Sequence, residues 1–442
     1  MGRCLFTVWP IPGHYNPALA LAHALAERGN TVAFYTGNRA RAVVEREGFE
    51  VLPFARVDEE YVDRLLFDGT DAPRWRQLAA QRRRLRRWLT GMLREQVEDL
   101  TVVLREWQPD VIVCDVSMWG PHVVLAETHD VPVVIFQFQA GCLLPGPGAP
   151  PAGFGLAPPR TRAARGMVAA VRALSALATR GLREDANQVR AAYRLPPLSG
   201  SVMAHAAEMP LYLVTSAPEL DYERRDLPAC VQYIGPCHWD RPQSETPPAW
   251  LSQLGLRPVV HVTEGTIHAR KPFLLAAASA GLAERDVDVI MTTGRHRHPS
   301  ALGFDRLPSN VRLEPWIAHS VLFSRTDVVV TTGGAGTVLA ALAAGIPLLV
   351  VPTEWDKPES ARRVEQAGAG LMLPPHRCTP DRVRAAVEQL LDDRRFRRNA
   401  ARVGAALRRC GGAPRAAKLI EQHTRHRYDT APSQSRSVEM TT

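Results

Sequence analysis

DVVVTTGGAGTVLAALAAGIPLLVVP, residues 327–352, joins two apolar strands through a short helix, and glycines stand where the helix begins. The first strand runs into Gly333, Gly334 and Gly336, and the second ends at Pro352. Two apolar strands joined by a helix are typical of the parallel βαβ unit. The stretch therefore predicts an α/β fold with a parallel sheet.

The same alternation of strands and helices occupies both halves of the chain. The predicted strands are 4–9, 31–36, 49–54, 111–116, 131–137 and 211–215 in the first half, and 258–263, 287–293, 311–316, 327–332 and 347–352 in the second. This pattern predicts two doubly wound, Rossmann-like domains that face each other across a cleft. We expect the domains at residues 1–232 and 251–423, a linker at 233–250 and a disordered tail at 424–442.

Two local signals complete the outline of the first domain. Asn16 is a suitable cap for the first helix, Pro17 suits its first turn and Gly29 can close it. The Pro/Gly-rich stretch 143–159 predicts a long surface loop.

Each doubly wound domain is expected to carry a site where the carboxyl ends of strands 1 and 4 meet. In the first domain this rule brings together His14, which follows strand 1, and Asp115, at the end of strand 4. In the second domain it brings together residues 263–266 and 331–337.

The second of these sites has the chemistry of an anion site. Glycines let a ligand approach the backbone, and a helix start offers unpaired N–H groups and the positive end of a dipole. The hydroxyls of Thr266, Thr332 and Thr337 can add hydrogen bonds. A diphosphate fits, whereas the spacing and lysine of a P-loop are missing. The alternative is that the glycines only allow close packing of strand and helix.

Composition narrows the class of protein. The 442 residues contain no apolar run of about 18 residues, so we expect no membrane span. Seven scattered cysteines favour neither a disulfide framework nor a zinc site, and a cytoplasmic protein is expected. The formal charge of +9 comes largely from arginines such as those in 81–95, best interpreted as a solvated helix face. The alternative is weak contact with a membrane surface or an acidic partner. No nucleic-acid motif is present, and no such partner is expected.

The motifs, taken together, resemble one enzyme family. Residues 327–370 look like the donor-binding signature of the two-domain (GT-B) nucleotide-sugar glycosyltransferases of family 1, and PIPGHYNPALALAHALAERG at 10–29 resembles that family's N-terminal signature. VTEGT at 262–266 and EPWIAHSVLF at 314–323 occupy further expected places, so the resemblance covers about residues 3 to 420. Bacterial members that resemble this chain mostly modify natural products such as macrolides, polyketides and indolocarbazoles.

The resemblance implies an inverting transfer of a sugar from a UDP- or dTDP-sugar to a hydroxyl or N–H of a hydrophobic or aromatic small molecule. The first domain would bind the acceptor and the second the donor, with no cofactor and no metal. The implied donor-binding residues are Thr266, Trp316, His319, Thr332, Gly333, Gly334, Gly336, Thr337, Asp356 and Lys357.

Individual roles follow from the same resemblance. Gly334, Gly336 and Thr337 would hold the diphosphate, assisted by Thr266. Trp316 would stack on the nucleotide base, although it suits a hydrophobic core as well. Asp356 would contact sugar hydroxyls, and it is also a favoured N-cap for the helix that follows.

Several positions depart from the family's usual residues. They are Thr332 in place of His, Ala340 in place of Glu, Lys357 in place of Gln, Ser360 in place of Asn and His319 in place of Gln. Glu264 also stands among the phosphate-facing residues, where we expect it to turn away or to pair with Arg295 or Arg297.

His14 and Asp115 are the predicted catalytic pair. A neutral imidazole can take the acceptor's proton as the acceptor attacks the anomeric carbon, and the carboxylate can orient the ring and stabilise its protonated form. From the residues alone, a loop-fixing histidine and a helix-capping aspartate are the alternatives, and the resemblance at GHYNP favours catalysis.

The acceptor pocket is predicted to come from the variable segments 60–95 and 138–175. Candidate apolar side chains are Trp75, Leu78, Phe136, Phe138, Leu143 and Phe154. Two other functions stay open for this fold: a nucleotide-sugar epimerase-like enzyme, and a non-catalytic protein that binds a ligand or a partner glycosyltransferase.

Overall fold

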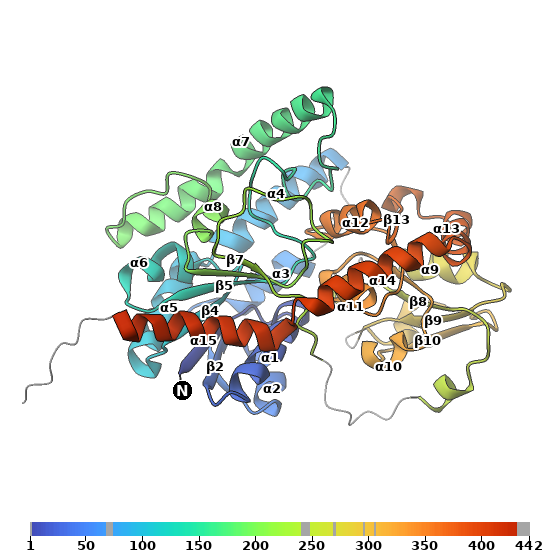
Figure 1. Ribbon diagram of the computed structural model, residues 1–442, viewed down its shortest axis with the longest axis horizontal. Coiled ribbons are helices and arrows are strands. Elements are labelled where there is room, and N and C mark those ends of the chain that lie inside the picture. The colour runs from blue at the N-terminus through green and yellow to red at the C-terminus, as the bar shows by residue number, and fades with distance from the viewer. Residues whose placement is uncertain are drawn as a thin grey trace, which may run out of the picture.

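The computed structural model describes residues 2–67, 74–239, 248–267, 271–294, 297–304 and 306–430. Two sheets made of parallel strands lie side by side, each covered by helices on both faces (Figure 1). The predicted α/β class and the doubly wound architecture are confirmed.

The first sheet has seven strands in the order β3-β2-β1-β4-β5-β6-β7. The strands are β1 (Arg3–Thr7), β2 (Thr31–Thr36), β3 (Glu50–Pro53), β4 (Val111–Asp115), β5 (Val133–Gln137), β6 (Leu211–Val214) and β7 (Val231–Tyr233). Its central strands are mostly apolar because helices bury both faces, which makes a core cluster on each side of the sheet. The pairing of β1 with β4 is the expected switch point.

The second sheet has six strands in the order β10-β9-β8-β11-β12-β13. The strands are β8 (Val259–Thr263), β9 (Asp288–Thr292), β10 (Val311–Glu314), β11 (Val328–Thr331), β12 (Leu348–Val350) and β13 (Gly370–Met372). Here β8 and β11 are neighbours, so the two loops predicted to meet do lie at one edge of the sheet.

Helices of very different lengths connect the strands. In the first half they are α1 (Pro12–Ala26), α2 (Asn38–Arg46), α3 (Glu59–Phe67), α4 (Arg74–Thr90), α5 (Leu93–Trp107), the π-helical turn η1 (Pro121–Leu125), α6 (Ala126–Thr128), α7 (Arg162–Ala192) and α8 (Val202–Ala206). In the second half they are η2 (Ala249–Gln253), α9 (Phe273–Gly281), η3 (Pro299–Leu302), α10 (His319–Phe323), α11 (Ala335–Ala343), α12 (Lys357–Gln366), η4 (Pro375–Arg377), α13 (Pro380–Asp392), α14 (Arg394–Arg409) and α15 (Gly412–Thr430).

The first helix begins earlier than predicted. α1 starts at Pro12, with Ile11 as its extended N-cap, so Asn16 and Pro17 lie inside the helix. Proline at the first helical position costs nothing because its missing N–H would have had no partner there. The prediction that Asn16 caps the helix is therefore wrong. Gly29 does close the segment, with φ +85° and an N–H bond to the Ala26 carbonyl.

The end of the chain also differs from the predicted division. α15 packs against α1, and its residues Ala416, Ala417 and Ile420 are buried in a core cluster of the first sheet. Gly411 and Gly412 have positive φ and allow the chain to cross back before this helix (Figure 1). The helix continues to Thr430, so 424–430 of the predicted tail are helical, and 431–442 lie outside the described residues. In the predicted linker, 240–247 also lie outside them.

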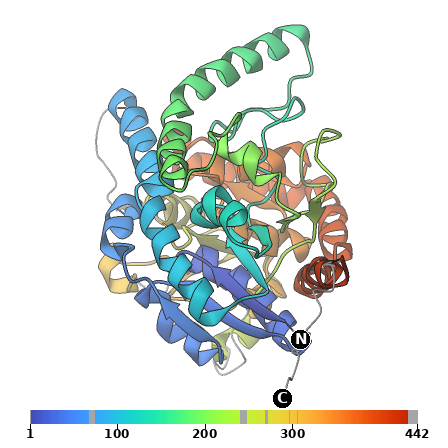
Figure 2. The same cartoon turned by 90° about the vertical axis from the view of Figure 1, so that its left-hand side faces the viewer.

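The longest helix, α7, extends away from the body of the molecule beside α4 (Figure 2). Arg86 of α4 forms a two-pronged ion pair with Asp185 of α7, and Arg82 donates to the Ala178 carbonyl. Part of the arginine-rich surface of α4 therefore binds a neighbouring helix, in addition to facing solvent as expected.

Candidate active site

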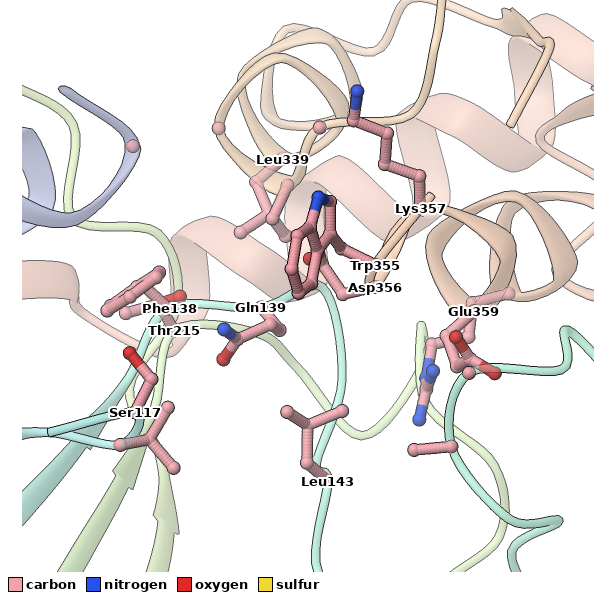
Figure 3. A pocket seen from close by; sticks show the side chains of 18 of the residues that line it. Ser117, Phe138, Gln139, Leu143, Thr215, Leu339, Trp355, Asp356, Lys357 and Glu359 are labelled. Carbon is pink, nitrogen blue, oxygen red and sulfur yellow. The ribbon is translucent and has the colours of Figure 1, made fainter. Parts of the chain in front are cut away.

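A cleft of about 1970 Å³ is lined by residues of both sheets' loops and helices. All the implied donor-binding residues except Gly333 line it, and so does His14. Figure 3 shows side chains from the first domain, such as Ser117 and Phe138, facing Leu339 and Trp355 of the second across this space.

The structure brings His14 and Asp115 together. His14 lies in the first turn of α1 just after β1, and Asp115 ends the neighbouring strand β4. Nδ1 of His14 is 2.6 Å from Oδ2 of Asp115, and the two residues are 8% and 1% exposed. Within the described residues no hydrogen bond is formed by Nε2 of His14, the nitrogen left for a ligand in the cleft.

The surroundings hold both side chains in place. Oδ1 of Asp115 accepts hydrogen bonds from the backbone N–H and the hydroxyl of Ser117, at 2.8 and 2.7 Å. The ring of His14 lies edge-on to Phe138 and Trp88, with centroids 4.6 and 5.9 Å away. A fixed carboxylate and two packed rings leave the imidazole few alternative orientations.

The glycines at the start of α11 are not equivalent. Gly333 has φ +92°, and a Cβ there would lie 2.8 Å from Val350, so the fold itself requires this glycine. A Cβ at Gly334 or Gly336 would meet nothing within 4 Å. The last two glycines therefore leave open space above the N-terminus of a nine-residue helix.

The threonines around this helix start are not equivalent either: one is used within the fold and two face the cleft. Thr332 is buried, and its hydroxyl donates to the Glu264 carbonyl at 2.9 Å, which ties the β8 and β11 loops together. Thr266 is exposed and Thr337 is half-buried, and both line the cleft. The hydroxyl proton of Thr332 is thus already donated within the protein. This differs from our expectation that it would be donated to a bound anion.

Glu264, which lines the cleft, is held by an ion pair and a backbone hydrogen bond. Its carboxylate accepts from the Arg297 guanidinium at 2.8 Å and from the backbone N–H of Leu274 at 3.0 Å. The expectation that an arginine meets this charge is confirmed for Arg297, whereas Arg295 lies outside the described residues. The phosphate-facing loop therefore presents no free carboxylate at this position.

Asp356 and Lys357 begin α12 beside the same loops. Asp356 occupies the N-cap position, but its side chain makes no capping hydrogen bond, so the capping alternative is wrong. Burial raises the pKa of Asp356, and the nearby Lys357 and His14 oppose that rise. Nζ of Lys357 donates to the Ile267 carbonyl at 2.7 Å and to the Thr353 hydroxyl at 3.0 Å, and burial lowers its pKa to about 8.

Trp316, the predicted base-stacking residue, and His319 both line the cleft. Trp316 is half-buried there rather than part of the core. His319 stacks on Phe323 one turn later in α10, with centroids 4.5 Å apart and ring planes at 12°. Both rings line the cleft. Ala340 also lines it, whereas Ser360 is buried and bonds to the Asp356 carbonyl.

Only some of the residues predicted to form the acceptor pocket line the cleft. Phe138, Leu143 and Phe154 line the cleft, but Phe136 is fully buried in β5. The side chains of Trp75 and Leu78 lie outside the described residues.

Trp88 and Trp355, whose rings line the cleft 5.2 Å apart, are not among the named candidates, although Trp88 lies in the predicted acceptor segment 60–95. The sequence contains no signal for the contact between these two rings, because it spans the two domains.

Direct bonds join the two domains over one edge of the cleft. The Gly155 N–H donates to Glu359 and the Gly155 carbonyl accepts from Arg362, each at 2.8 Å. Arg363 reaches Asp221 at 2.8 Å. The Pro/Gly-rich loop is therefore held against α12 rather than free on the surface.

Comparison with known proteins gives consistent relatives. Residues 277–413 match the family model described as Erythromycin biosynthesis protein CIII-like, C-terminal domain. The chain is 34% identical to 4'-demethylrebeccamycin synthase of Lentzea aerocolonigenes, over 91% of this chain and 94% of that protein. It is 26% identical to demethyllactenocin mycarosyltransferase of Streptomyces fradiae, over 95% and 86%.

Solved structures show the same fold. The glycotransferase of kitacinnamycin superposes with a TM-score of 0.73 at 22% identity, over 96% of this chain and 99% of that one. The Streptomyces sp. SF2575 glycosyltransferase SsfS6, solved with thymidine diphosphate, superposes with a TM-score of 0.67 at 20% identity, over 96% and 100%.

Proposed function

The chain belongs to the GT-B family of natural-product glycosyltransferases, which move a sugar from a nucleotide sugar to a small molecule, and from this premise we propose its chemistry. The second domain binds a UDP- or dTDP-sugar, and the sugar passes with inversion to a hydroxyl or N–H of a hydrophobic acceptor in the first domain. One observation carries the proposal: His14, which is bonded to Asp115, and the open start of α11 line the same cleft.

The donor's diphosphate sits above the N-terminus of α11 in this proposal. The unpaired N–H groups of the helix start and the positive end of its dipole attract the charge. The open space at Gly334 and Gly336 admits the phosphates, and the hydroxyls of Thr337 and Thr266 lie beside that space. Trp316 stacks on the base, and Asp356 accepts hydrogen bonds from sugar hydroxyls. SsfS6, a structural relative, was solved with thymidine diphosphate, which supports a nucleotide diphosphate ligand.

His14 acts as the base. Because Nδ1 is bonded to Asp115, Nε2 takes the proton of the acceptor hydroxyl or N–H as that group attacks the anomeric carbon. Asp115 then stabilises the imidazolium ring. The nucleotide diphosphate leaves from the opposite face of the sugar, which inverts the anomeric configuration.

The proposal includes no metal and no further cofactor, since the helix start and the hydroxyls stabilise the leaving diphosphate. The relatives do not favour the epimerase-like or non-catalytic alternatives. In the described part of the chain, no helix combines the length and apolarity needed to cross a bilayer. Action in the cytoplasm and weak contact of α4 with anionic membranes stay predictions.

Calorimetric titration with UDP and with dTDP tests the donor site, using wild type, Gly336→Val and Gly255→Val. Both glycines have open space for a side chain, but Gly255 lies outside the cleft, so both variants should fold. We expect Gly336→Val alone to lose nucleotide binding. Wild type that binds neither nucleotide, or a folded Gly336→Val that binds as tightly as wild type, would overturn the proposal.

A further inference from the structure

Three aromatic side chains from the two domains lie in a chain of ring contacts that begins at the proposed base. Trp88 of α4 and Phe138 after β5 both pack against His14. Trp355, just before α12 in the second domain, places its ring 5.2 Å from that of Trp88, at 76°. These residues, here called the aromatic wall, line the cleft beside His14.

Trp355 is held in an unusual backbone conformation. Its φ is +65°, a region that bulky side chains rarely occupy and that is over-represented at ligand sites. The preceding Glu354 forms an ion pair with Arg84 of α4 at 3.3 Å, and the Arg84 guanidinium lies 5.3 Å from the centroid of the Trp355 ring. Contacts with the first domain thus hold Trp355 toward α4 and the acceptor side.

Polar atoms at the edge of the wall have no partner. Among the described residues, nothing bonds to the indole N–H of Trp88 or of Trp355, or to Oε1 of Gln139, although all three atoms are covered. Figure 3 shows Phe138, Gln139 and Trp355 along one side of the cavity, with Leu143 below them. Covered indole N–H and amide groups are normally hydrogen-bonded, so these atoms suit a ligand to which the rings adjust.

We propose that Trp355 belongs to the acceptor site and that the aromatic wall binds a planar aromatic acceptor carrying oxygen or N–H groups on its edge. The inference rests on the proposed function. Aromatic faces favour a flat partner in stacked or edge-to-face contact, whereas a saturated macrolactone offers no such face. The two indole N–H groups suit acceptor carbonyl oxygens, and Gln139 Oε1 suits an acceptor N–H or hydroxyl.

The arrangement also couples the two substrates. Trp355 contacts the acceptor, while the next residue, Asp356, is proposed to contact the sugar. One short segment of the second domain therefore places the acceptor relative to the donor.

Calorimetry with two probes tests the inference: the flavonol kaempferol, which is planar, and erythronolide B, a saturated macrolactone. We expect wild type to bind kaempferol more tightly than erythronolide B. In Trp355→Leu the Kd for kaempferol should rise about fivefold to twentyfold, and in Trp355→Phe, which keeps a ring, about threefold or less. Trp107→Phe is the matched control, because its indole bonds to Glu50 away from the cleft.

Titration of the same variants with UDP and dTDP separates the two claims. Trp355→Leu should bind the nucleotide within about twofold of wild type, since the ring contact of Trp355 is with Trp88 of the first domain. Unchanged kaempferol binding in Trp355→Leu, equal binding of both probes, or no binding of kaempferol by wild type would overturn the inference. A loss confined to nucleotide binding would overturn it as well, by assigning Trp355 to the donor. Failure of the proposed function would instead show as wild type that binds no nucleotide.

Discussion

His14 carries the proposed proton transfer, and its neighbours make the role testable. His14→Gln keeps a polar side chain of similar size but removes the base, so kcat should fall about 10²- to 10⁴-fold. Donor affinity should stay unchanged, because the start of α11 is untouched. Asp115→Asn should also lower kcat, since an amide can favour the wrong imidazole tautomer.

His23→Gln is the matched control for this measurement. His23 lies on the same helix, bonds to Glu47 and does not line the cleft. Initial rates of sugar transfer at saturating donor and acceptor give the comparison. If His14→Gln transfers sugar at the rate of the control, another residue is the base.

Lys357 gives a pH dependence of stability whose sign follows from its burial. The pKa in the folded protein is about 8, below its ordinary value of 10.5, so folding favours the neutral amine. Below about pH 8 Lys357 is protonated in both the folded and the unfolded state, and the free-energy cost of burying its charge is fully present. Between about pH 8 and 10.5 the unfolded state binds more protons, and stability rises with pH by up to about 1.4 kcal/mol per unit.

The measurement is the difference in unfolding free energy between wild type and Lys357→Met in urea, from pH 7 to 10.5. We expect the unfolding free energy of wild type to rise relative to that of the variant above about pH 8 and not below it. A constant difference across this range would mean that burial does not perturb the ammonium of Lys357.

The residues of the site differ in how far the sequence alone predicts them. The pairing of His14 with Asp115 follows from strand order, because the carboxyl ends of strands 1 and 4 always meet. Trp355 was not predicted, since its role depends on a positive φ and on a ring contact across the domains. Nor does the sequence separate Gly333 from Gly336, because the positive φ of Gly333 and its packing against Val350 distinguish them.

The turn between β11 and α11 depends on one glycine for its shape. Gly333→Ala should lower the free energy of unfolding by about 1–3 kcal/mol, because φ is +92° and a Cβ would lie 2.8 Å from Val350. Gly334→Ala, with φ −58° and open space, should change stability by less than about 0.5 kcal/mol. Urea unfolding of the two variants provides the test, and equal effects would contradict the structural role of Gly333.

Helices and strands were predicted best where the chain is apolar and long enough to be buried on both faces. β7 and β13 were missed because three residues give too little periodicity to recognise. The start of α1 was misplaced because Asn16 and Pro17 are good start signals locally, while Pro12 satisfies the same rule earlier. The return of α15 to the first sheet was not predicted, since an amphipathic helix does not specify which domain it packs against.

The two domains are joined by a buried ion pair. Arg363 of α12 and Asp221 after β6 have side chains that are 3% and 0% exposed. The guanidinium also reaches the Cys142 carbonyl and lies 4.4 Å from the ring centroid of Tyr222. A Cβ at Gly141 would overlap this guanidinium, so the glycine makes room for it. The geometry of the cleft therefore depends on a charge that crosses from one domain to the other.

Removing one partner should lower the unfolding free energy by far more than the intact pair adds to it. Arg363→Met leaves Asp221 buried without its cation, and we expect a loss of about 3–5 kcal/mol in unfolding free energy. The double variant Arg363→Met/Asp221→Asn should recover part of that loss, because no buried charge is left unpaired. Arg180→Met, which breaks an exposed pair with Glu184, should cost less than about 1 kcal/mol. Thermal or urea unfolding of wild type and these three variants measures the differences in unfolding free energy. If Arg363→Met costs no more than Arg180→Met, the domains are held together mainly by contacts other than this pair.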